Sequence, residues 1–236
     1  MKIATLIATP LLAAAFVSNV KAQTTQPPRS SLYLRGGLNI SNITVDKNGN
    51  IDDNKSIASF NAGVMADLPI GNYFAIQPGL LFTGKGAQIV QGNTSGNNWV
   101  RATTRPYYIE IPVNAVGKIP IGDQTNLFLG AGPYLGIGVG GHNKTEGQVA
   151  GVGFSRTEQI KFSDDNPFTG TEEGSGYGIM RRYDYGVNVT GGVQTSFAIF
   201  SVNYGIGLAK LQSGTSSSAD ELNKYRIWSF NVGFRL

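Results

Sequence analysis

The chain has 236 residues, of which 14% are charged and none is cysteine, and its formal net charge is +4. The lack of cysteine excludes both a disulfide framework and a thioether lipid anchor. The cations form no clustered basic stripe, so a nucleic-acid partner is not expected. With 32 glycines and 10% aromatic residues, the composition is glycine-rich and poor in charge.

The first 22 residues have the features of a secretory signal peptide. Lys2 supplies the positive start, residues 3–17 are apolar, and small residues precede Gln23, where cleavage is expected. The apolar stretch is shorter than the roughly 20 residues of a transmembrane helix, and Pro10 interrupts it. Domain 1–22 is therefore predicted to be a signal peptide, 23–30 an extended leader, and 31–236 a single domain.

The body of the chain is a series of runs in which apolar and polar residues alternate. Successive side chains of a strand point to opposite faces, so each run predicts a strand with one apolar and one polar wall. In the last run, Trp228, Phe230 and Phe234 oppose Asn231 and Arg235. The runs span residues 31–44, 57–68, 73–87, 105–119, 125–140, 182–195, 197–210 and 225–236.

The connections between these runs are alternately long and short. The short ones are residues 70–72, 120–126 and 195–196, and the long ones are 45–56, 88–104, 141–181 and 211–224. Short periplasmic turns with long extracellular loops are typical of outer-membrane barrels. The sequence therefore predicts an all-β fold, an eight-stranded antiparallel transmembrane β-barrel in the cell outer membrane. A soluble lipocalin-like barrel is the alternative, but neither wall has the charge density of a water-exposed surface.

Several charged residues fall on the polar, inward wall. An eight-stranded barrel is just wide enough to be filled by its own side chains, and buried charges must be paired. We therefore expect an internal salt-bridge network, although a conduction path beside the glycine-rich wall of residues 130–140 is the alternative. The predicted network comprises Arg35, Asp67, Glu110, Lys118, Asp184 and Arg235.

A second group of cations lies at the extracellular ends of the runs, at positions that the alternation assigns to the lipid-facing wall. Cations at that depth can pair with the phosphates of lipopolysaccharide, and arginine can do so in bidentate fashion. The alternative is that strand-end cations extend into water. The predicted lipopolysaccharide contacts are Arg105, Arg181, Lys210 and Arg226.

The sequence carries little that indicates metal binding or catalysis. Acidic groups in residues 46–53 and 164–173 could offer oxygen ligands to calcium, but they lack the spacing of an EF-hand loop. His142 is the single histidine, and one histidine without an evident nucleophile is weak support for a hydrolase. Neither a cofactor nor a metal site nor a catalytic set is predicted.

Several segments resemble the PorT-like outer-membrane β-barrel proteins. They are residues 106–113 (PYYIEIPV), 130–136 (GAGPYLG), 183–186 (YDYG), 203–208 (NYGIGL) and the closing 230–236. The resemblance implies an outer-membrane barrel and, from the family's namesake, an association with protein secretion. The terminal strand also resembles the signal read by the barrel-assembly machinery, which implies contact with that machinery during insertion.

The function expected from these features is non-enzymatic. The barrel would have a structural or binding role through its extracellular loops, chiefly residues 141–181, with lipid, lipopolysaccharide or an envelope protein as partner. A narrow porin-like channel is the first alternative, and a lipid-modifying or proteolytic enzyme is the second.

Overall fold

The computed structural model describes residues 29–43, 54–163, 179–209 and 224–236. All regular structure in this part of the chain is β-strand. The strands are β1 (Ser31–Ile43), β2 (Asn54–Lys55), β3 (Ile57–Pro69), β4 (Phe74–Gly84), β5 (Ala87–Gly92), β6 (Trp99–Gly122), β7 (Thr125–Val149), β8 (Val152–Gln159), β9 (Lys161–Ser163), β10 (Ile179–Arg181), β11 (Tyr183–Gln194), β12 (Ala198–Gly207) and β13 (Tyr225–Arg235).

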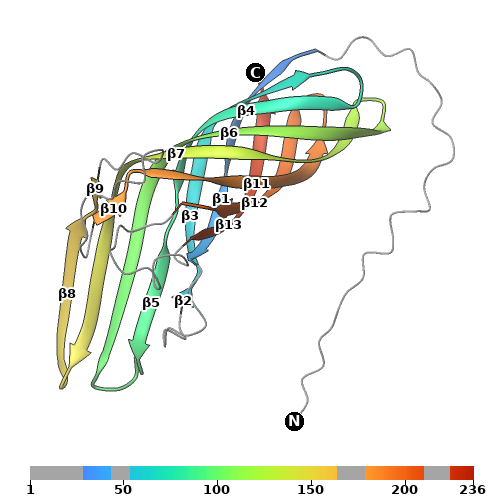
Figure 1. Ribbon diagram of the computed structural model, residues 1–236. Coiled ribbons are helices and arrows are strands. Elements are labelled where there is room, and N and C mark those ends of the chain that lie inside the picture. The colour runs from blue at the N-terminus through green and yellow to red at the C-terminus, as the bar shows by residue number, and fades with distance from the viewer. Residues whose placement is uncertain (1–28, 44–53, 164–178, 210–223) are drawn as a thin grey trace, which may run out of the picture.

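Eight of these strands close into a ring. Antiparallel pairings connect β1, β3, β4, β6, β7, β11, β12 and β13 in that order, and β13 returns to pair with β1. Figure 1 shows this barrel, with the first described residues and the C-terminus at one end. A closed sheet leaves no unpaired edge in lipid, which is the condition for crossing a membrane with strands. The predicted eight-stranded barrel is confirmed.

The two walls of the barrel differ as the alternation predicts. Large apolar side chains remain exposed on the outer wall: Leu34 55%, Phe74 66%, Leu129 68%, Phe200 52%, Trp228 49% and Phe234 54%. Polar side chains are buried inside, among them Asn39, Asn61, Gln77, Asn114 and Thr190. Facing water, so large an apolar surface would be unfavourable, but facing lipid tails it is what a membrane protein needs.

The ends of the barrel are unlike each other. Short turns join β3 to β4, β6 to β7 and β11 to β12 at the end where the C-terminus lies, so this end is periplasmic. At the opposite end, β6 and β7 continue far beyond the ring, with 24 and 25 residues respectively. β5 pairs with the extended part of β6, and β8 with that of β7.

These extensions form a sheet that stands above the membrane. We call it the blade: residues 87–104 and 142–159 with β2, in the strand order β2-β5-β6-β7-β8 (Figure 1). The prediction of loops at residues 88–104 and over the first part of 141–181 was therefore wrong. The hairpin between β7 and β8 closes at Ala150 and Gly151, whose positive φ angles of 50° and 83° suit a two-residue hairpin turn.

A β-bulge marks the junction of barrel and blade. Tyr107 lies opposite Gly140, whereas Tyr108 lies opposite Gly138, so β7 carries one extra residue there. A bulge of this kind shifts the alternation of the strand beyond it. As a result, even-numbered residues of β7 face the lumen below the bulge, while above it His142 and Lys144 share a face with Arg105.

Candidate functional site: a filled lumen beneath an extracellular blade

The periplasmic half of the lumen is filled around one aspartate. Asp67 Oδ2 lies 2.5 Å from Lys118 Nζ, and only 2% of the Asp67 side chain is exposed. Gln77 Nε2 donates to Asp67 Oδ1 at 3.0 Å, and Gln194 Nε2 donates to Asp67 Oδ2 at 3.1 Å. Gln194 Nε2 also lies 2.8 Å from the hydroxyl of Tyr33, so polar and aromatic side chains together fill this half.

The extracellular half of the lumen is organised by Lys85, just beyond β4. Its Nζ lies 2.6 Å from Glu110 Oε2 and 2.7 Å from Asp184 Oδ2, and 1% of the side chain is exposed. The ammonium group also lies over the ring of Tyr134, 4.4 Å from the centroid. An ammonium that contacts two carboxylates and an aromatic face has exchanged its water shell for fixed partners.

Lys85 is absent from the network predicted above, although alternation in the run 73–87 assigned it to the polar wall. The sequence therefore held the necessary signal. It did not show that two carboxylates, from β6 and β11, converge on this amine. Lys85 lies near the end of its run, and Glu110 and Asp184 follow it by 25 and 99 residues along the chain.

An apolar cap closes the lumen above Lys85. Ile160, Met180 and Phe162 pack with Tyr108 and Tyr225, and the ring of Tyr108 meets that of Phe162 edge-on at 5.9 Å. Gly138 makes this possible, because a Cβ on it would lie 2.7 Å from Cζ of Phe162. Segments β9 and β10, which pair in parallel, thus lie across the barrel mouth.

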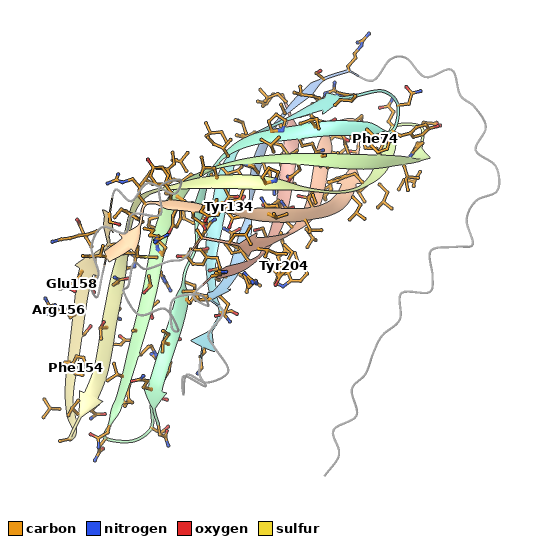
Figure 2. All side chains as sticks on the ribbon, in the orientation of Figure 1. Phe74, Tyr134, Phe154, Arg156, Glu158 and Tyr204 are labelled. Carbon is orange, nitrogen blue, oxygen red and sulfur yellow. The ribbon has the colours of Figure 1, made fainter. Side chains whose placement is uncertain are left out.

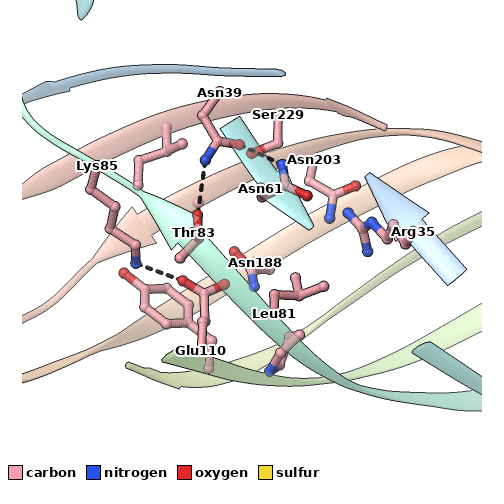
Figure 3. A pocket seen from close by; sticks show the side chains of 14 residues that line it. Arg35, Asn39, Asn61, Leu81, Thr83, Lys85, Glu110, Asn188, Asn203 and Ser229 are labelled. Atoms are coloured by element: carbon pink, nitrogen blue, oxygen red, sulfur yellow. Dashed lines mark hydrogen bonds and ion pairs between the residues drawn. The ribbon is translucent and has the colours of Figure 1, made fainter. Parts of the chain in front are cut away.

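Between the two charged clusters lies a small polar cavity of about 30 Å³. Figure 3 shows Arg35, Asn39, Asn61 and Glu110 around it, with Asn39 Nδ2 donating to Thr83 Oγ1 at 2.8 Å. A single water needs roughly 10–15 Å³ of such space, so the cavity has room for two or three waters.

The predicted interior residues are placed as follows. Arg35, Asp67, Glu110 and Asp184 are buried in the lumen, and Lys118 is 10% exposed in its ion pair. Arg235 lies elsewhere: it is exposed at the periplasmic rim and Nη1 donates to the Ser196 carbonyl at 3.4 Å. The physical reason is that β13 ends at Arg235, where the barrel already opens to water.

The four predicted lipopolysaccharide contacts have different surroundings. Arg105 is exposed on the outer wall of β6. Arg226 Nη1 donates to the carbonyls of Tyr225 and Gly207, at 2.8 and 3.1 Å, and Arg181 is half-buried on β10. Lys210 lies outside the described residues.

The outer face of the blade carries its own charged group. Arg101 Nη1 lies 3.1 Å from Glu146 Oε1, and Lys144 Nζ lies 2.5 Å from Glu146 Oε2. Hydrogen bonds from Lys144 and Arg101 lower the pKa of the Glu146 carboxyl. His142 lies opposite Arg105 on the neighbouring strand, so it joins this cationic face.

The arrangement offers little to catalysis or metal binding. Glu146 follows His142 by four positions on a continuous strand, which separates them by about 13 Å along β7. Within the described ranges, no group of three His, Asp or Glu side chains could hold a metal ion. Both acidic segments, 46–53 and 164–173, lie outside those ranges. No helix in the described part of the chain is long and apolar enough to span a membrane.

Comparison with solved structures returns small outer-membrane proteins. They are the attachment invasion locus protein Ail of Yersinia pestis (13% identity, TM-score 0.39, 89% of this chain and 100% of that one), Neisserial surface protein A (11%, 0.40, 89% and 99%) and OprG of Pseudomonas aeruginosa (11%, 0.41, 89% and 97%). At these identities and TM-scores, the likenesses carry no information on function. No curated protein matches the chain.

A family comparison covers most of the chain. The family described as "Outer membrane protein beta-barrel domain" matches residues 21–213, which include all but the last strand of the ring. The match agrees with the closed sheet and with the apolar outer wall described above. The chain therefore belongs to the outer membrane protein β-barrel domain family and resides in the cell outer membrane.

Proposed function

We propose that this protein is a non-enzymatic binding protein, in which the barrel is a membrane anchor and the blade is the recognition surface. The observation that carries the proposal is the combination of a filled lumen with two strands that continue past the membrane into a solvated sheet. The ring of strands needs no such extension to close or to insert into the membrane. A sheet held at a fixed height above the membrane is suited to contact with another surface or molecule.

The narrow channel is the weaker candidate. Two ion-paired clusters and an apolar cap occupy the lumen, and the polar cavity between them has a volume of about 30 Å³. We expect purified protein in planar lipid bilayers to show no conductance steps of defined size. A porin reconstituted in the same way is the positive control, and reproducible steps from this protein would favour the channel.

Affinity purification from cross-linked outer membranes tests the binding role. The full chain is compared with a variant in which short turns replace residues 88–103 and 143–159, which removes the blade and retains the ring. We expect a stoichiometric partner with the full chain and none with the variant. A partner that is retained by the variant, or none in either sample, would contradict recognition by the blade.

Lipopolysaccharide is proposed as a lateral partner of the same protein. Arg105 and Lys144 are exposed on the outer face, close above the aromatic cluster of Phe60, Phe82 and Tyr107, in which the Phe82 and Tyr107 rings stack at 5.4 Å. Aromatic girdles mark the membrane boundary, and phosphate groups of the lipid occur at the height just above it.

The double variant Arg105→Gln/Lys144→Gln tests this contact. We expect it to retain several-fold less lipopolysaccharide phosphate through detergent purification, because two exposed cations are lost from one face. Lys55→Gln/Lys161→Gln, which removes two exposed cations from β2 and β9, is the control for the same change of charge. Equal retention by all three proteins would contradict the contact.

The likeness to PorT-like proteins extends the proposal to a place in a secretion or envelope assembly. The support is the set of motifs at residues 106–113, 130–136, 183–186 and 203–208, which the structure places on ring strands β6, β7, β11 and β12. Contact with the barrel-assembly machinery through the closing strand β13 is proposed for insertion alone. The partner found by affinity purification would identify any such assembly.

A further inference from the structure

One strand of the blade has an edge without a partner. β8 is the last strand of the sheet, and no strand in the described part of the chain pairs with its other side. All eight residues of β8 are exposed. Figure 2 shows Phe154, Arg156 and Glu158 along this outermost strand. An open edge of this kind is a template for pairing with another strand.

A hydrogen bond next to the end of β8 shows which of its residues direct their backbone N–H and C=O groups to the open edge. The Ile160 amide donates to the Gly141 carbonyl at 3.1 Å, so even-numbered residues direct their backbone groups toward β7. In an antiparallel ladder the direction alternates from residue to residue. The amides and carbonyls of Ser155, Thr157 and Gln159 therefore point away from β7, toward the open edge.

We propose that this edge binds a second copy of the same chain, through antiparallel pairing of β8 with β8. The two-fold axis passes beside Thr157, so that each Thr157 lies opposite its counterpart. In that register Arg156 of each copy lies opposite Glu158 of the other, and odd-numbered residues face odd-numbered ones, as the backbone parity requires. Two cross-strand pairs of opposite charge then form at one contact.

Charge selects this register among the symmetric ones. A shift by two residues in one direction places Arg156 opposite Arg156, and in the other direction Glu158 opposite Glu158. Like charges directly opposite each other destabilise a sheet. The alternative function of charges on an edge is to prevent pairing, for which a repeated charge of one sign is effective. β8 has one charge of each sign, and within the strand Arg156 Nη2 pairs with Glu158 Oε1. In the Thr157 register each of these side chains gains an opposite charge from the second copy.

The orientation of the blade indicates where the second copy resides. Figure 1 shows β6 and β7 bending where they leave the ring, so that the strands of the blade lead away from the barrel mouth. The two-fold axis of an antiparallel pair is perpendicular to the sheet, so it reverses the direction in which the blade strands lead away from the barrel. Rotation about such an axis turns the second barrel over. The contact thus joins proteins of two facing membranes. This inference rests on the proposed function, since it identifies the partner of the blade.

The test uses full-length protein in lipid vesicles with the blade outward. Wild-type vesicles are expected to cluster, whereas Arg156→Glu vesicles and Glu158→Arg vesicles, each of which opposes like charges, are not. Mixing the two variants restores opposite pairs and should restore clustering. Lys55→Glu, a charge reversal on exposed β2 at the other side of the blade, is the control and should cluster as wild type does.

Cysteine variants check the register directly. Vesicles with Arg156→Cys mixed with vesicles with Glu158→Cys should form several-fold more disulfide-linked dimer under mild oxidation than either population alone. Clustering by both charge variants alone, or no clustering in their mixture, would overturn the proposal. If wild-type vesicles do not cluster but affinity purification still finds a blade-dependent partner, self-pairing fails while the proposed function stands.

Discussion

Replacing Lys85 with methionine is expected to lower the free energy of unfolding by about 3–5 kcal/mol. The variant keeps the volume of the side chain but leaves Glu110 and Asp184 in the lumen without their shared ammonium, which lies within 2.7 Å of each. Removing one member of a buried ion pair leaves an uncompensated charge, whose desolvation is then no longer offset. Urea titration of the protein in lipid vesicles, followed by tryptophan fluorescence, measures the change.

A triple variant separates charge from packing. Lys85→Met/Glu110→Gln/Asp184→Asn removes all three charges, so most of the lost stability should return, because no charge is left unpaired at this cluster. If the single variant were as stable as wild type, the lumen would have to be wet enough at Lys85 to solvate two carboxylates. The filled-lumen interpretation, and with it the argument against a channel, would then fail.

The barrel was predictable because lipid imposes a simple rule on its strands. Leu34, Phe200 and Phe234 had to face outward, and alternation then assigned Arg35, Asp67 and Asp184 to the lumen, where the structure places them. What alternation cannot supply is the pairing. Alternation alone does not predict that Lys85 contacts Asp184, or that Arg235 is exposed at the rim. Both features depend on where each strand ends in the ring.

The blade was not predictable by the same rule. Residues 99–104 and 142–149 are mostly half-buried or exposed on both faces, so they show no apolar wall and have the composition of a loop. Their strand conformation comes from pairing between β6 and β7, a contact between distant segments. His142 and Lys144 were not assigned to the face of Arg105 because residues 141–181 were predicted to be a loop. The extra residue of β7 near Val139 also shifts the alternation at that point.

The cations at the strand ends show a further limit of predicting side-chain direction from alternation. Arg105 and Arg226 have the same outward parity, yet Arg226 Nη1 donates to two backbone carbonyls while Arg105 is exposed at the membrane boundary. A long side chain at a strand end can turn back to its own backbone or extend to a lipid head group. The sequence pattern cannot distinguish them, so the structure was needed to separate the exposed Arg105 from Arg226, while Lys210 lies outside the described residues.

Replacing Gly132 with alanine is expected to destabilise the barrel by about 1–3 kcal/mol, as overpacking does. Gly132 lies on the inner wall of β7, and a Cβ there would overlap the Val113 carbonyl oxygen and lie 2.7 Å from Cα of Asn114. Both atoms belong to the backbone of β6, so they cannot move without disturbing the pairing of β6 with β7. The change is measured by the same urea titration in vesicles.

Gly140 supplies the matched control on the same strand. No heavy atom lies within 4 Å of a Cβ built at Gly140, on the outer wall just above the bulge. Alanine there restricts the unfolded chain without a new contact, so Gly140→Ala should be neutral or more stable, by up to roughly 1 kcal/mol. Equal effects of the two substitutions would mean that the glycines of β7 serve strand flexibility in general. Opposite signs would show that Gly132 is required by the close approach of the β6 backbone at Val113 and Asn114.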